Sequence, residues 1–248
     1  CTRVEEGAPD LRSLIGKGAN DTSIGVGYAP LSPTERLVLD LEGEVRSIRG
    51  AGEDTKIMAV RINDRLNLVV AAAMVDRFIG SREDYEEAKA RVHEKVKKVA
   101  GQSSEVGVNC ADSGDNIFLT VTGTSIEMGD DGATGRGNRG NGLITPMRPM
   151  TMEAIAGKNP VSHVGKIYNV LAQRCAGEIA MLEGIEEAHV TLVSKIGSPI
   201  SQPLLKAVRI SGNIKLSAAM ESEINDILDH WLLSIVDLVE EFVKGSLR

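Results

Sequence analysis

The chain has 248 residues, of which 42% are hydrophobic and 25% charged, so it can bury an apolar core without disulfides or a structural metal. Aromatic residues make up only 3%, and the formal net charge is -7, which argues against a protein that binds nucleic acid through stacked bases or phosphate backbones. The three widely spaced cysteines suggest no disulfide framework or zinc site, and no apolar run could cross a bilayer, so we expect a cytoplasmic protein without a membrane partner.

The first predicted helix begins after residue 32. Ser32-Pro33-Thr34-Glu35 supplies an N-cap, a proline at the first helical position and an acid that can close a capping box. The apolar residues that follow share one helix face: Leu37, Leu41, Val45 and Ile48. The stretch 16–30, ahead of this helix, is predicted to be a loop.

A hairpin is predicted next, because residues 56–62 and 66–75 are rich in β-formers. The stretch 68–74 is apolar on both faces, so we expect it inside the sheet. Ser81 then opens a helix with an inward stripe at Tyr85, Ala88, Val92, Val96 and Val99. Residues 106–110 and 117–122 are predicted to be strands around a turn.

The C-terminal half continues this alternation of helices and hairpins. Asn159-Pro160 is predicted to start a helix, residues 189–195 and 204–211 to be strands, and the chain to close on one amphipathic helix. Trp231 is predicted to be a core anchor of that helix and Gly245 its stop. The pattern predicts an α+β fold of repeated helix-plus-hairpin units, with helices covering one face of each sheet.

Residues 129–142 contain six glycines and two arginines. Glycines let backbone amides approach an anion closely, and the guanidinium groups of Arg136 and Arg139 suit phosphate oxygens. A flexible surface loop is the alternative. Neither a dinucleotide fingerprint nor a Walker A motif fits, because no long helix follows and Gly157-Lys158 is followed by Asn159.

A second candidate for anion binding surrounds Lys158. Asn159 can cap the predicted helix, which puts Lys158 at its positive end, and Asn159, His163 and Lys166 share one helix face. Cations at a helix N-terminus oppose the macrodipole unless an anion lies with them, so a bound phosphate would make the arrangement favourable. The alternative is a pair of solvated lysines and a hydrogen-bonded core histidine.

Taken together, these segments resemble the S-adenosylmethionine synthetases, most closely the archaeal type. The resemblance is carried by residues 19–30, 71–77, 119–142 and 142–169, and above all by the long phrase that runs from Asn141-Gly142-Leu143-Ile144-Thr145-Pro146 through Met152-Glu153-Ala154 to Gly157-Lys158-Asn159-Pro160-Val161-Ser162-His163. It implies an enzyme in which the methionine sulfur attacks the ribose C5′ of ATP and expels triphosphate, which is then hydrolysed.

The resemblance also implies roles for single residues. Arg136 and Lys158 would hold the triphosphate, and we add Arg139, His163 and Lys166 from their charge and position. The remaining candidates match or adjoin family positions for methionine, ribose and phosphate: Asp21 for methionine, Asp130 with its neighbour Asp131 in the substrate pocket, Asp54 for the ribose hydroxyls and Lys56 for a phosphate oxygen.

Two departures limit this transfer of roles. Ser162 and Val164 stand where bacterial and eukaryotic relatives have a lysine and a magnesium-binding aspartate. The early Gly-His-Pro-Asp motif, which supplies the transfer histidine and a magnesium ligand, does not occur in these residues. Two explanations are open: an N-terminal segment preceding residue 1 is missing, which we expect from the start of the chain in mid-element, or the chain is a natural short form with an incomplete site. We expect this chain alone to have little synthase activity, and the metal ligands are unknown.

The resemblance further implies Mg²⁺, with K⁺ as a second candidate cation, and a homodimer or higher homo-oligomer with the site between subunits. We expect residues 1–128 to supply the methionine and ribose contacts and residues 129–248 the triphosphate loop. The alternative functions are a non-catalytic module that binds ATP or triphosphate, and a structural subunit of an oligomer.

Overall fold

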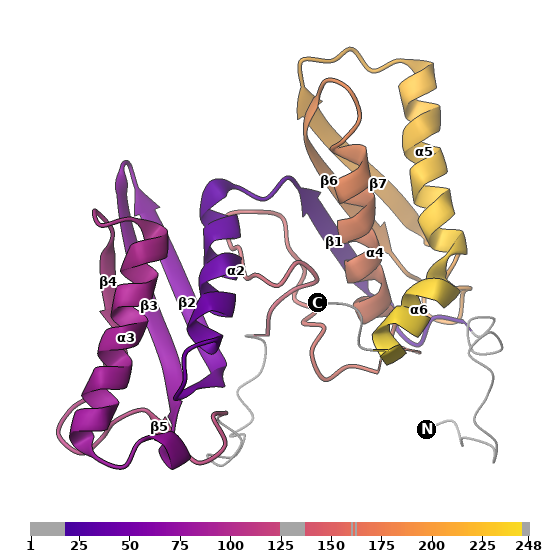
Figure 1. Ribbon diagram of the computed structural model, residues 1–248. Helices are drawn as coiled ribbons and strands as arrows, with labels where there is room; N and C mark the ends of the chain where they lie inside the picture. The colour runs from indigo at the N-terminus through magenta and orange to yellow at the C-terminus, as the bar shows by residue number, and fades with distance from the viewer. Residues whose placement is uncertain (1–17, 125–136, 160, 162, 245–248) are drawn as a thin grey trace, which may run out of the picture. The chain divides into compact units, whose positions relative to one another are not determined.

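The computed structural model describes residues 18–124, 137–159, 161 and 163–244. These residues form two compact units, and each has its own sheet and its own apolar core (Figure 1). Unit 1 contains residues 18–30 and 137–244, and unit 2, residues 31–124, is inserted between them in the chain. The predicted division after residue 128, into helix-and-hairpin units with the methionine and ribose contacts and a part with the triphosphate loop, stays a prediction.

Unit 2 begins with the helix that the capping box predicted. The Ser32 hydroxyl accepts a hydrogen bond from the Glu35 N–H at 3.2 Å, and the Glu35 carboxylate accepts one from the Ser32 N–H at 2.7 Å. The elements of the unit follow in this order: α2 (Pro33–Arg46), β2 (Ala51–Ile62), β3 (Arg65–Val75), the 3-10 turn η1 (Asp76–Phe78), α3 (Arg82–Ala100), β4 (Glu105–Val108) and β5 (Leu119–Thr120).

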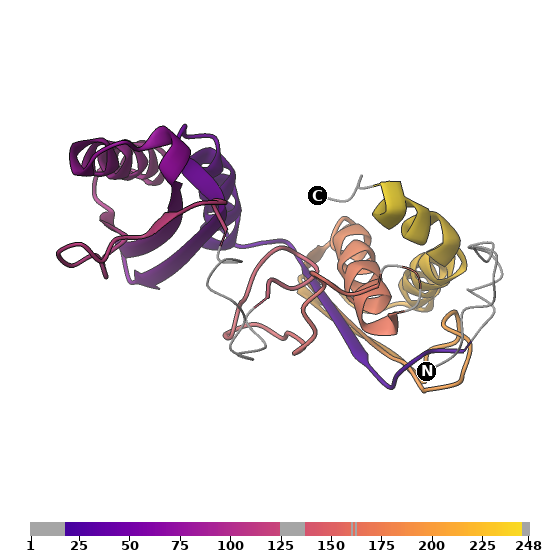
Figure 2. The same ribbon diagram turned by 90° about the horizontal axis from the view of Figure 1, so that it is seen from below.

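The sheet of unit 2 is built around β3, as its apolar sequence predicted. β2 pairs with β3 antiparallel, whereas β4 and β5 both pair with β3 in parallel. The predicted strands at 106–110 and 117–122 therefore do not pair with each other, because each finds the backbone of the central strand instead. Helices α2 and α3 cover one face of this sheet (Figure 2). Val99 was expected to face inward, but it is 38% exposed near the end of α3.

Unit 1 has a three-stranded antiparallel sheet in the order β1-β6-β7. Its elements are β1 (Ile24–Ala29), α4 (Val164–Ile179), β6 (Ile185–Val193), β7 (Leu205–Gly212), α5 (Ala218–Leu233) and α6 (Ile235–Lys244). The three helices lie on one face of the sheet (Figure 2). No helix in the described ranges is both long and apolar enough to cross a membrane.

Strand β1 falls within the stretch that the sequence predicted to be a loop. Its alternate residues Gly25 and Gly27 face α4, where a Cβ on either glycine would overlap the backbone of Tyr168 or Ala172. The glycines thus allow the strand and the helix to approach more closely than side chains would permit. This packing explains a glycine content that, in the sequence alone, favours a loop.

Two helix boundaries differ from the prediction. Helix α4 starts at Val164, not at Asn159, because the Asn159 side chain accepts a hydrogen bond from the Val161 N–H in a turn of its own. The Asn20 side chain, from the segment before β1, accepts from the Val164 N–H at 3.1 Å instead. The predicted C-terminal helix is two helices that meet at Ser234, where the backbone leaves the helical conformation.

The lone tryptophan packs where the sequence predicted. Trp231 is partly buried against the core of unit 1, and the guanidinium carbon of Arg174 lies 4.8 Å from the centre of its ring. Gly245, the predicted helix stop, lies outside the described residues.

Candidate functional site

Lys158 lies in a polar cluster at the start of α4. Its Nζ atom is 3.0 Å from Oε2 of Glu153, and Oε1 of Glu153 accepts a hydrogen bond from the Ser23 hydroxyl at 3.2 Å. The side chains of Lys158 and Glu153 are 27% and 26% exposed. A Cβ on Gly165 would lie 2.8 Å from Ser23 Oγ, 3.0 Å from Glu153 Cδ and 3.1 Å from His163 Cε1. We call Ser23, Glu153, Lys158, His163 and Gly165 the Lys158 cluster.

The electrostatics of the cluster favour an ionised carboxylate. Burial alone would raise the pKa of Glu153, but the hydrogen bond and charge of Lys158, the Ser23 hydroxyl and the charge of His163 together hold that pKa below its ordinary value. The His163 Nδ1 atom is buried and makes no hydrogen bond to any described residue. The cluster therefore combines an ammonium group, a carboxylate and a histidine with an uncommitted ring nitrogen.

Lys166 and Asp21, two further predicted site residues, lie next to the cluster. The Lys166 ammonium donates to the backbone carbonyl of Lys158 at 3.3 Å and lies 5.1 Å from the centre of the Phe242 ring. The Asp21 carbonyl accepts from Ser194 Oγ, which in turn accepts from the Ser23 N–H at 2.8 Å. The Asp21 side chain is exposed. Unit 1 thus brings Asp21, Lys158, His163 and Lys166 to one region.

The Arg139 side chain donates hydrogen bonds to the backbone of its own segment. It is 7% exposed, its Nε donates to the Thr151 carbonyl at 2.8 Å, and its Nη1 donates to the Gly137 carbonyl. A Cβ on Gly140 would lie 3.0 Å from the carbonyl oxygen of Asn169 in α4. These contacts fix the end of the glycine-rich segment against the stretch that carries Glu153.

A second arginine, Arg148, ties the same stretch to the sheet. Its guanidinium carbon lies 4.1 Å from the centre of the Tyr28 ring, and its Nη2 donates to the Pro30 carbonyl at 3.0 Å. Nη1 pairs with Glu187 on β6, which also lies 3.3 Å from Nε2 of His189. Residues 137–159 form no helix or strand, and they are anchored at both Arg139 and Arg148.

Asp54 and Lys56 lie in unit 2, on the first half of β2. The Lys56 ammonium is 2.9 Å from Asp54 Oδ1, and the lysine side chain is 67% exposed. The Asp54 N–H donates to the Gly123 carbonyl at 2.9 Å. The pair thus lies beside Gly123, near the end of the described part of unit 2.

Three predicted residues, Arg136, Asp130 and Asp131, lie outside the described residues. Elsewhere in the chain, across 18–124 and the described parts of 137–244, no three histidine, cysteine, aspartate or glutamate side chains come close enough to hold a metal ion.

Sequence reasoning assigned no role to Ser23, Glu153 or Arg148. Glu153 belongs to the phrase Met152-Glu153-Ala154 within the family resemblance, so an acid five residues before a candidate lysine was a usable signal. Ser23 and Arg148 gave no such signal, because their partners come from distant parts of the chain.

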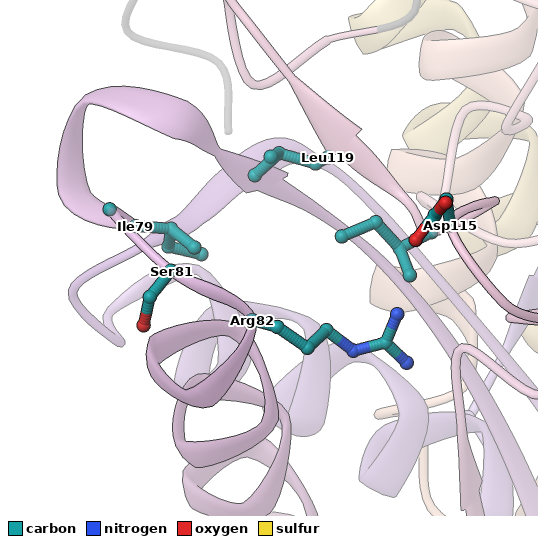
Figure 3. Close-up of a pocket in the computed structure, with 7 residues that line it drawn as sticks. Ile79, Ser81, Arg82, Asp115 and Leu119 are labelled. Atoms are coloured by element: carbon teal, nitrogen blue, oxygen red, sulfur yellow. The ribbon is translucent and has the colours of Figure 1, made fainter.

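A separate open pocket of about 230 Å³ lies at the start of α3, and its lining residues are Ile79, Gly80, Ser81, Arg82, Asp115, Ile117 and Leu119 (Figure 3). The Arg82 guanidinium is already paired there, with the Gly114 carbonyl at 2.6 Å and with Glu86 at 2.8 Å. Among these described lining residues there is none that the sequence predicted to bind substrate.

Comparison with known proteins gives one consistent result. A family model described as S-adenosylmethionine synthetase (AdoMet synthetase) matches residues 1–246. The S-adenosylmethionine synthase of Methanococcus aeolicus is 44% identical over 263 residues, which cover 99% of this chain and 65% of that protein. That of Pyrococcus horikoshii is also 44% identical, with 99% of this chain and 66% of that protein covered. The chain thus spans about two thirds of the length of these relatives.

A solved structure shares the fold. The structure described as an unusual S-adenosylmethionine synthetase from Campylobacter jejuni superposes with a TM-score of 0.56 at 16% identity, and the match covers 90% of this chain and 66% of that one.

Proposed function

Because this chain belongs to the S-adenosylmethionine synthetase family, we propose that the protein makes S-adenosylmethionine from ATP and methionine. Within the described residues, the observation that best supports the proposal is the Lys158 cluster. It holds a partly buried ammonium group at the start of a helix, which is a favourable place for a phosphate group.

In the proposed reaction the methionine sulfur attacks C5′ of the ribose, the C5′–O5′ bond breaks, and its electron pair leaves with the triphosphate. The triphosphate gains negative charge as it leaves, so a cation fixed beside it stabilises the transition state, by roughly 3 kcal/mol for one well-placed group. We assign this role to Lys158, together with Arg136 from the glycine-rich loop. Water then cleaves the triphosphate to pyrophosphate and phosphate beside the same cations.

The neighbouring cations have different proposed roles. His163, within the cluster, and Lys166, beside it, lie close enough to Lys158 to add a hydrogen bond or charge to the same anion. The Arg139 guanidinium is buried and donates hydrogen bonds to two backbone carbonyls. These bonds support a role in holding its own segment in place, rather than the predicted contact with the triphosphate.

The remaining predicted residues are proposed to bind the same parts of the substrates as the family resemblance implies. The exposed carboxylate of Asp21 suits the ammonium group of methionine and the sulfonium that forms. Asp54 is proposed to accept hydrogen bonds from the ribose hydroxyls, and Lys56 to bind a phosphate oxygen once its pairing with Asp54 is released. Asp130 and Asp131 are proposed to line the substrate pocket.

Magnesium and potassium also stay proposals. The described residues contain no group of three or more histidine, cysteine, aspartate or glutamate side chains that could hold a metal ion, so no residue is assigned to either cation and no step depends on them.

A homo-oligomer is supported by the face of the unit 2 sheet that lies opposite its helices. Met58, Val60, Ile62 and Val69 are 45% to 65% exposed there, and Met58 is paired directly with Val69 across β2 and β3. A contiguous exposed apolar surface is typical of a protein–protein interface.

The test is the formation of S-adenosylmethionine by the full-length protein from ATP and methionine. Replacement of Lys158 by alanine should lower kcat about 100-fold. The exposed Lys215 offers a matched control, since Lys215→Ala removes the same charge outside the cluster and should leave kcat unchanged. A protein that binds ATP but releases no phosphate in response to methionine would instead be a binding module, and the proposal would be wrong.

A further inference from the structure

The partner of Lys158 is a carboxylate, and this has a direct bearing on how the lysine can bind a phosphate. The ammonium group lies 3.0 Å from Glu153 Oε2, within the distance of a charge-assisted hydrogen bond. Neither side chain is freely solvated, since about a quarter of each is exposed. Their attraction is therefore screened less than that of a surface ion pair.

Glu153 is itself held in place by its surroundings. Its second carboxylate oxygen accepts from the Ser23 hydroxyl at 3.2 Å, and its backbone N–H donates to Thr151 Oγ1 at 3.2 Å. Gly165, in the first turn of α4, leaves room for the carboxylate carbon, which a Cβ would approach to 3.0 Å. The carboxylate is thus fixed at the positive end of a helix, where the helix dipole favours an anion.

We propose that Glu153 is the resting partner of Lys158 and that a polyphosphate must displace it to bind. The carboxylate occupies the position on the ammonium group that a phosphate oxygen would take. This inference rests on the proposed function, in which Lys158 binds the triphosphate.

The need to displace Glu153 from Lys158 weakens polyphosphate binding in two ways. The ion pair between Lys158 and Glu153 must be broken, and the displaced carboxylate remains a like charge close to the incoming anion. Removal of the Glu153 charge should therefore tighten the binding of polyphosphate. For the proposed reaction, the same carboxylate returns to the ammonium group as triphosphate or its hydrolysis products leave, so that it speeds product release.

The experiment is isothermal titration of the full-length protein with inorganic tripolyphosphate, which needs no turnover. Glu153→Gln keeps the shape of the side chain but removes its charge, and it should lower the Kd about tenfold. The matched control is Glu186→Gln, which removes one charge from an exposed side chain on β6 and should leave the Kd within about twofold. An unchanged or higher Kd for Glu153→Gln would overturn the inference.

A double-mutant cycle shows whether Glu153 acts through Lys158. Lys158→Ala should raise the Kd for tripolyphosphate, and in that background Glu153→Gln should lower it by less than in the wild type, because only the repulsion between like charges is left to remove. If Lys158→Ala leaves the Kd unchanged, the proposed function of Lys158 fails together with the inference. If Lys158→Ala raises the Kd but Glu153→Gln has no effect, only the inference fails.

A second variant keeps the test decisive should Glu153→Gln not fold. Glu153→Asp retains the charge but shortens the side chain by one methylene, which withdraws the carboxylate from Lys158. It should lower the Kd for tripolyphosphate by a smaller factor, and an unchanged or raised Kd would again overturn the inference.

Discussion

The side chain of Asn109 pairs with the backbone of Ala72 as a neighbouring strand would. Its Oδ1 accepts from the Ala72 N–H at 2.8 Å, and its Nδ2 donates to the Ala72 carbonyl at 3.0 Å. Asn109 directly follows β4, and its φ of 45° lies in the left-handed region, which asparagine tolerates better than most residues. The carboxamide thus continues the hydrogen bonding of β3 beyond the end of β4.

Replacement of Asn109 by alanine should destabilise unit 2. The change removes the side-chain partner of two buried backbone groups of Ala72 and the hydrogen bond to the Tyr85 hydroxyl, so we expect a loss of about 2–4 kcal/mol in the free energy of unfolding. Urea denaturation followed by circular dichroism measures the loss. Asn67→Ala, on β3 in the same sheet, is the control and should cost less than about 1 kcal/mol. Equal effects of the two changes would contradict the assignment.

The two glycines of α4 should respond to alanine in opposite directions. A Cβ at position 165 meets Ser23, Glu153 and His163 at 2.8 to 3.1 Å, so Gly165→Ala should cost about 1–3 kcal/mol and disturb the Lys158 cluster. A Cβ at position 177 meets nothing within 4 Å, so Gly177→Ala should stabilise the protein by about 0.5–1 kcal/mol. Thermal unfolding of both variants provides the comparison, and a stabilising Gly165→Ala would refute the crowded geometry.

The stability that depends on Glu153 should be lost in acid. Folding lowers the pKa of this carboxyl below its ordinary value of 4.5, so the stabilisation is complete above pH 4.5 and is lost as the pH falls through the lower folded value. The difference in Tm between the wild type and Glu153→Gln should therefore shrink when the pH is taken from 6 toward 3. Melting curves across this range measure it, and a difference that does not vary with pH would count against an ionised, paired Glu153.

Charges placed on the uncovered face of the unit 2 sheet should weaken self-association. The double change Met58→Lys and Val69→Lys puts two ammonium groups directly opposite each other on β2 and β3, at positions that are 65% and 49% exposed. Light scattering after gel filtration should show a smaller particle than the wild type. Met147→Lys, at a methionine that is 95% exposed outside this sheet, should leave the mass unchanged. An unchanged mass for the double variant would place any subunit contact elsewhere.

Local chemistry made much of the fold predictable. The capping box at Ser32 and Glu35 gave the start of α2, and the spacing of Tyr85, Ala88, Val92 and Val96 gave the buried face of α3. Family membership, predicted from the sequence segment that ends at His163, is confirmed by the match to the family model and by the identity to archaeal S-adenosylmethionine synthases. These features depend on residues within a few turns of one another, or on a long contiguous match.

The features that the sequence did not predict depend on distant contacts. The glycines of β1 can be understood as strand residues only when α4 is seen to pack against them. The start of α4 likewise depends on Asn20, which caps it from a distant part of the chain. The same holds for the site. Lys158 could be selected from its position in the family segment, but the Ser23 hydroxyl that holds its partner Glu153 comes from 130 positions away in the chain.

The strand order of unit 1 determines when that unit can form during synthesis. Strand β1 leaves the ribosome about 160 residues before its partner β6, a delay on the order of 10–30 s at typical rates of translation. All of unit 2 emerges in that interval, with its complete sheet and both of its helices. Unit 2 is therefore able to fold before unit 1, because the sheet that carries β1 can close only after β6 has emerged.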